Sequence, residues 1–148
     1  MARKTFEALR IKDCQHPLDR KALIALEKTP GLSLLLNKIN EYGVDRLLRM
    51  QAVGADFKVT ATNFPRLYRS FAEACEILGI FPIPDLYLYR GNGHIDSYAI
   101  GVKKPLVGVN LETMEWFSDS ELVFYLATEL GRIGGKYLTY QQLARVMP

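Results

Sequence analysis

A short polar set near the end of the chain carries the residue types best suited to chemistry. Thr128, Glu129 and Arg132 lie within five residues of one another, on a segment whose apolar spacing predicts a helix. Positions 128 and 132 are one helical turn apart, the spacing at which two histidines bind one zinc ion. Here neither position holds a histidine.

The helix that presents these residues has a clear start. Ser118 and Glu121 have the spacing of a capping box, in which each side chain satisfies a free amide of the other residue. We expect the helix to run at least to Ile133. Glu129 and Arg132, three residues apart, then form an ion pair. If exposed it contributes a few tenths of a kcal/mol; the favoured alternative is a partly desolvated pair that replaces a metal ion as a cross-link.

The remaining elements are those needed to position this helix. The order of helices and closely spaced strands predicts an α+β fold with an antiparallel or mixed sheet of hairpin-like pairs. Gly43 marks a kink or break in the second helix. The expected helices span residues 18–28, 32–51, 63–78 and 138–146, with a helical turn over 111–116 and strands over 57–60, 86–89, 97–102 and 106–110. The second helix offers for burial Leu35, Leu36, Ile39, Tyr42, Leu47 and Met50.

Composition narrows the class of protein. The 148 residues carry a net charge of +3 without a basic run, so no nucleic-acid partner is predicted. No apolar stretch is long enough for a membrane span, and no secretory signal is recognised. Cys14 and Cys75 give no disulfide framework, which indicates a reducing, cytoplasmic location, with an organelle lumen such as the plastid stroma as the alternative. We expect an N-terminal arm over residues 1–15 and a single domain over 16–148.

Several segments together resemble a known family. In order along the chain, they are His16-Pro-Leu-Asp19, Phe64-Pro65-x-Leu-Tyr68, Asp96-Ser-Tyr98-Ala99-Ile-Gly101, Ser118-Asp-Ser-Glu121-Leu122 and Ala127-Thr-Glu129-Leu130-Gly131-Arg-Ile133. This series resembles the HtpX-like, CAAX-prenyl-endopeptidase-like gluzincin peptidases (metallopeptidase family forty-eight), in their short soluble branch. The resemblance implies a minimal zincin-like domain, with helices on a small mixed sheet and the motif helix in the core. It also implies that Glu129 occupies the position of the general base.

The departures from the family pattern concern the metal. Thr128 and Arg132 stand where the family has its two zinc-binding histidines, and an arginine cannot be deprotonated to coordinate zinc. The third ligand, a glutamate on a later helix, has no counterpart before Pro148. We therefore expect zinc to be lost, no other cofactor, and a catalytically inactive pseudopeptidase that acts as a protein-binding or structural subunit. The alternative is a zinc metalloendopeptidase, or a fragment of one, whose missing ligands come from elsewhere.

Tyr98, Ala99, Ile100 and Gly101 are the candidate binding segment. In the peptidases that this chain resembles, the segment is an edge strand that pairs with an extended polypeptide. An exposed edge offers free N–H and C=O groups to such a partner. The equal alternative is that Tyr98 and Ile100 pack inward and the edge is covered. A protein or polypeptide partner is thus expected, and no oligomeric state is predicted.

Overall fold

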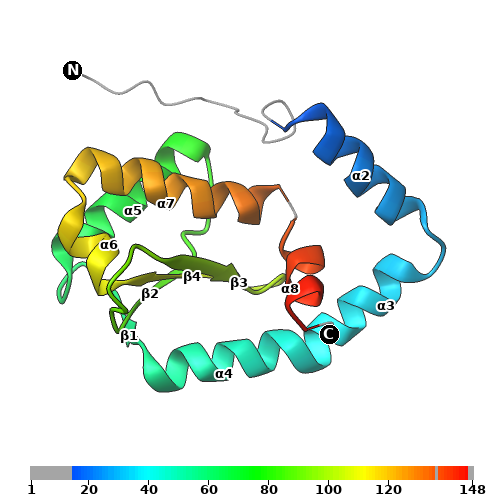
Figure 1. Cartoon of the computed structure of the whole chain (residues 1–148), viewed down its shortest axis with the longest axis horizontal. Helices are drawn as coiled ribbons and strands as arrows, with labels where there is room; N and C mark the ends of the chain where they lie inside the picture. Colours follow the sequence, from blue (N-terminus) through cyan, green and yellow to red (C-terminus); the bar gives the residue numbers. More distant parts are fainter. Residues whose placement is uncertain (1–14, 136, 147–148) are drawn as a thin grey trace.

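The computed structural model describes residues 15–135 and 137–146, with side chains as far as residue 142. It is a mixed α/β structure with a small sheet between helices (Figure 1). The helices are α2 (Pro17–Lys28), α3 (Leu32–Ile39), the π-helical turn η1 (Asn40–Val44), α4 (Asp45–Ala55), α5 (Pro65–Leu78), α6 (Leu111–Trp116), α7 (Asp119–Gly134) and α8 (Leu138–Val146). The strands are β1 (Phe57–Lys58), β2 (Asp85–Tyr89), β3 (Ser97–Ile100) and β4 (Leu106–Asn110).

The four strands form a mixed sheet in the order β1-β2-β4-β3. β2 and β4 are parallel, whereas β1 and β3 pair antiparallel at the two edges. The mixed sheet was expected, but the prediction of successive hairpins is wrong for β2 and β3. Residues 90–96 carry the chain past the position of β4, so β3 forms the far edge and β4 returns between β3 and β2. Gly101, at φ 90°, makes the tight return possible, because a Cβ there would lie 2.5 Å from the Lys104 carbonyl oxygen.

The larger core lies between α5, α7 and one face of the sheet (Figure 1). From α7 it takes Leu122, Leu126 and Leu130, all completely buried and four residues apart along one side of the helix. Phe71 of α5 and Val107 of β4 are also completely buried in it. The helix that carries the polar set is therefore part of the core, as expected.

The opposite face of the sheet is covered more thinly, by α4 (Figure 1). Its cluster of buried residues consists of Ala52, Tyr87, Ile100 and Leu106. The expected burial of the second helix is wrong at every position except Leu36; the exposed residues are Leu35, Ile39, Tyr42, Leu47 and Met50. The expected break is real, but it takes the form of a π-helical turn that contains Gly43, after which α4 continues to Ala55.

The difference in length between the helix and the strands explains why these apolar residues are exposed. Residues 32–55 are helical almost throughout and extend over roughly 36 Å, whereas the strands of this sheet are at most five residues, about 17 Å, long. Much of the helical arc therefore extends past the sheet, and its periodic apolar residues find no surface to cover. α2 lies farther out and buries none of its residues. Within the described residues, no helix is long and apolar enough to cross a membrane.

Candidate functional site

The Glu129 carboxylate is the centre of a polar cluster between α7 and β3. Glu129 is 2% exposed, although its side chain is ionisable. Ser97, the first residue of β3, donates from Oγ to Glu129 Oε1 over 2.7 Å. The same Ser97 Oγ shares a hydrogen bond of 2.9 Å with the Tyr125 hydroxyl. Strand and helix are thus joined through one buried carboxylate, whose burial requires such partners.

Arg132 provides the opposite charge. Its Nη1 lies 2.9 Å from Glu129 Oε1 and 3.1 Å from Oε2, so one nitrogen donates to both oxygens. The Arg132 side chain is 45% exposed, whereas that of Glu129 is 3% exposed. The ion pair therefore has a buried acidic end and a solvated basic end. This geometry is that of a partly desolvated cross-link rather than of a fully exposed pair.

Thr128 does not join this cluster. Its Oγ1 donates to the carbonyl oxygen of Tyr125 over 2.6 Å, on the exposed side of α7. Thr128 and Arg132 are thus bonded to other groups and do not fit a zinc ion. In the part of the chain that the structure describes, no three His, Cys, Asp or Glu residues lie close enough together to hold a metal.

β3 forms the edge of the sheet beside this cluster. The Asn110 N–H donates to the carbonyl of Asp96, which makes that facing pair a hydrogen-bonded one. Hydrogen-bonded and non-bonded pairs alternate in antiparallel strands, so the N–H and C=O of Ala99, opposite Val107, point away from β4. The edge is partly covered, because α7 and α8 both contact β3 and Ala99 is 5% exposed.

The side chains of Tyr98 and Ile100 lie on the opposite face of the sheet from that of Ala99 and face α4. The Tyr98 ring lies across Gly108, and its hydroxyl donates to Asp56 Oδ2 over 2.7 Å. Burial raises the pKa of Tyr98. The inward packing that the sequence left open is therefore observed for these two side chains, while the backbone of Ala99 still faces the edge.

Sequence reasoning did not identify Ser97 and Tyr125 as members of the cluster. Tyr125 is four residues before Glu129, hence on the same side of the helix, and this spacing is a usable signal. No sequence signal points to Ser97, because its contact with Glu129 depends on which strand lies beside α7.

Cys75 is completely buried, and burial raises the pKa of its thiol to about 12. Cys14 lies outside the described residues.

Comparison with known proteins provides no family for this chain. No family model matches it, and a search of curated proteins finds no match to its sequence.

Proposed function

We propose that this protein is a catalytically inactive, peptidase-like subunit that binds a polypeptide along β3. The observation that carries the proposal is the contact of Arg132 with both oxygens of Glu129, at 2.9 and 3.1 Å. Both oxygens of Glu129 already accept hydrogen bonds, from the guanidinium and, at Oε1, also from Ser97, so the carboxylate is bonded to the protein rather than to a water molecule. The guanidinium also places a positive charge where the peptidases of the family hold their metal.

The arrangement around α7 supports a zincin-like fold within the observed mixed α/β structure. In the peptidases that this chain resembles, the motif helix lies in the core and the binding segment is an edge strand. Here α7 contacts β3, and β3 is antiparallel to β4 at the edge of the sheet. The resemblance of the sequence segments to family forty-eight and the placement of α7 in the core thus agree with each other.

Binding in this proposal uses main-chain groups rather than catalysis. An extended polypeptide beside β3 pairs with the outward N–H and C=O of Ala99 and adds a fifth strand to the sheet. Because Ala99 is only 5% exposed, a flanking helix must move aside for this pairing. Because α7 and α8 flank that edge, the partner is a single extended segment rather than a broad protein surface. Glu129 and Arg132 then act as a fixed wall of the binding site.

Zinc content tests the loss of catalysis. We expect the purified protein, analysed by elemental mass spectrometry, to hold far less than one zinc per chain. The double variant Thr128→His with Arg132→His is the matched comparison, and it should remain free of zinc because two histidines do not complete the three protein ligands that a catalytic zinc needs. Stoichiometric zinc in the unaltered protein would contradict the proposal and favour the alternative, a metallopeptidase whose remaining ligands come from another chain or segment.

Hydrogen exchange tests the binding edge. Extended peptides selected from a random library should slow exchange at Ala99 and leave the amides that bond to β4 unchanged. Ala99→Pro removes the outward N–H without removing a ladder bond, and proline is tolerated at such edge positions. This variant should lose peptide binding, whereas Tyr98→Phe, altered on the other face, should retain it. Selected peptides that bind Ala99→Pro equally well would rule out pairing along β3.

A further inference from the structure

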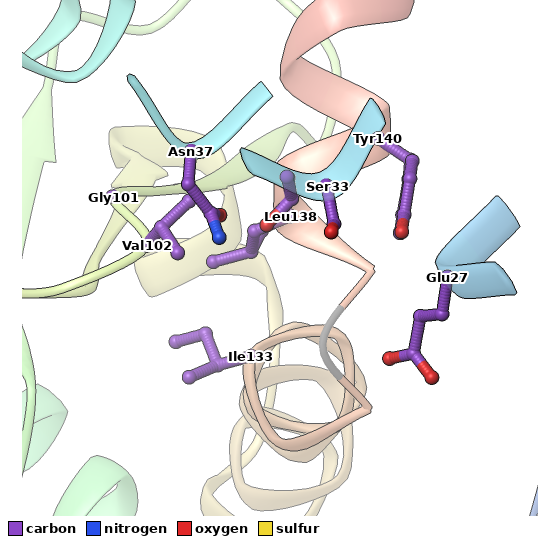
Figure 2. A pocket seen from close by; sticks show the side chains of 9 residues that line it. Glu27, Ser33, Asn37, Gly101, Val102, Ile133, Leu138 and Tyr140 are labelled. Atoms are coloured by element: carbon purple, nitrogen blue, oxygen red, sulfur yellow. The ribbon is translucent and has the colours of Figure 1, made fainter. Parts of the chain in front are cut away.

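A separate cavity lies beyond the end of β3. Its volume is about 350 Å³, within the usual range for ligand pockets. It is lined by residues of α2, α3, the turn that follows β3, the end of α7 and the start of α8 (Figure 2). These walls come from segments far apart in the sequence, so the cavity exists only in the folded protein.

The walls of the cavity differ in polarity. Val102, Ile133 and Leu138 contribute apolar surface on one side, where the Asn37 amide lies beside Val102 (Figure 2). Ser33, Tyr140 and Glu27 turn oxygen atoms toward the hollow from the other side (Figure 2). An occupant that satisfies both sides needs an apolar stem and a polar end.

Charge defines the polar end. Glu27 is the only charged residue among the described residues that line the cavity, and no ion pair of Glu27 is found in the described part of the chain. Burial, and then the negative charge of Glu27, raise the pKa of Tyr140. The described lining therefore carries one charge, the negative charge of Glu27, and this charge favours a cation over an anion of the same shape.

We propose that this cavity binds the side chain of an arginine or lysine. The guanidinium or ammonium group pairs with Glu27 and donates to the hydroxyls of Ser33 and Tyr140, while the methylene stem lies on Ile133 and Leu138. Gly101 and Val102 line the cavity and directly follow β3, so a polypeptide paired with β3 reaches it. This last point rests on the proposed function; the cation site itself does not.

The test uses free amino-acid derivatives, so that it is independent of β3. N-acetyl-arginine amide is titrated into the ¹⁵N-labelled full chain and followed by NMR, beside N-acetyl-citrulline amide, its neutral isostere. We expect the arginine derivative to shift the amides of Ser33 and Thr139 and to bind about tenfold more tightly than citrulline, a difference of 1.4 kcal/mol. Glu27→Gln should abolish that preference. Glu115→Gln, at an exposed position of α6, should preserve it, and the dispersion of each variant's spectrum shows that it is folded.

Equal binding of arginine and citrulline, no binding of either, shifts confined to other parts of the protein, or arginine binding that survives Glu27→Gln unchanged would each overturn the cation site. The outcome is separable from that of the proposed function. Arginine binding in the cavity without peptide pairing at Ala99 supports the cation site and contradicts peptide binding along β3. Peptide pairing at Ala99 that Glu27→Gln leaves unchanged supports peptide binding along β3 and contradicts the cation site.

Discussion

The two faces of the sheet are built from similar apolar residues but are filled to different degrees. On one face, α5 and α7 bring a continuous set of fully buried side chains against Leu86, Val107 and Val109. On the other, α4 contributes one buried residue, Ala52, while Leu47, Met50 and Val53 remain 59%, 64% and 55% exposed. The difference shows that helical periodicity alone does not produce burial; the sheet must also be long enough to receive the helix.

The contrast extends to the polar groups. Glu129 lies on the densely packed face, where the leucines of α7 fix the helix on which it stands. On the sparse face, the Tyr98 ring spans the sheet and its hydroxyl bond to Asp56 joins the edge strand to the end of α4. A cluster held by a core should tolerate the loss of one polar contact better than the loss of a core side chain.

Leu126→Ala tests the dense face and should have the largest effect. Leu126 is completely buried, so its truncation should cost about 2–5 kcal/mol of unfolding free energy. Leu47→Ala, the same substitution on α4, should change stability by less than about 0.5 kcal/mol, because Leu47 is 59% exposed. Urea denaturation measures both, and equal losses would mean that the two faces are packed alike.

Gly108→Ala tests the sparse face. A Cβ at this position would lie 2.2 Å from the Tyr98 ring, so the ring must move and its bond to Asp56 is lost. The expected cost is about 1–3 kcal/mol. In a Tyr98→Ala background the same substitution should cost much less, and a double-mutant cycle measures the coupling. Additive losses would show that the ring does not depend on Gly108.

Much of the dense face was predictable from local signals. The capping box of Ser118 and Glu121 forms, and the helix predicted over 63–78 is observed from Pro65 to Leu78. It ends beside Gly79, which adopts a left-handed conformation at φ 65°. The pairing of Glu129 with Arg132 followed from their spacing on α7.

The remainder depended on contacts between distant segments. The exposure of Leu47 and Met50 follows from the shortness of the strands, which no property of the helix encodes. The position of β3 depends on the path of residues 90–96, fixed in part by Asn110 and Glu112, which bond to that loop. Ser97 enters the polar cluster only because of that path. The periodicity of the sequence does not determine which strand lies beside which helix.

Arg132→Ala tests whether the core rather than the ion pair holds the polar cluster. The buried Glu129 carboxylate keeps its bond from Ser97 but loses the guanidinium, which should cost about 1–2 kcal/mol. In a Glu129→Gln background the loss should be much smaller, because no buried charge remains. Thr128→Ala, which removes only a bond to the helix backbone, is the control and should change little. A loss as large as that of Leu126→Ala would show that the pair, not the packing, positions α7.

Glu121→Gln tests the start of α7 and should have the smallest effect. Hydrogen bonds from the Ser118 hydroxyl and then from its N–H lower the pKa of Glu121 below its ordinary 4.5. A carboxyl group whose pKa is lower in the folded state stabilises the protein above pH 4.5 and loses this effect as the pH falls through the folded value. The melting temperature of the variant should therefore fall slightly below that of the unaltered protein at pH 7 and approach it in acid. Ser120→Ala, exposed on the same turn, should show no such convergence. A difference that stays constant from pH 7 to below pH 4 would mean that the carboxylate does not cap the helix in solution, and that α7 is held by its leucines alone.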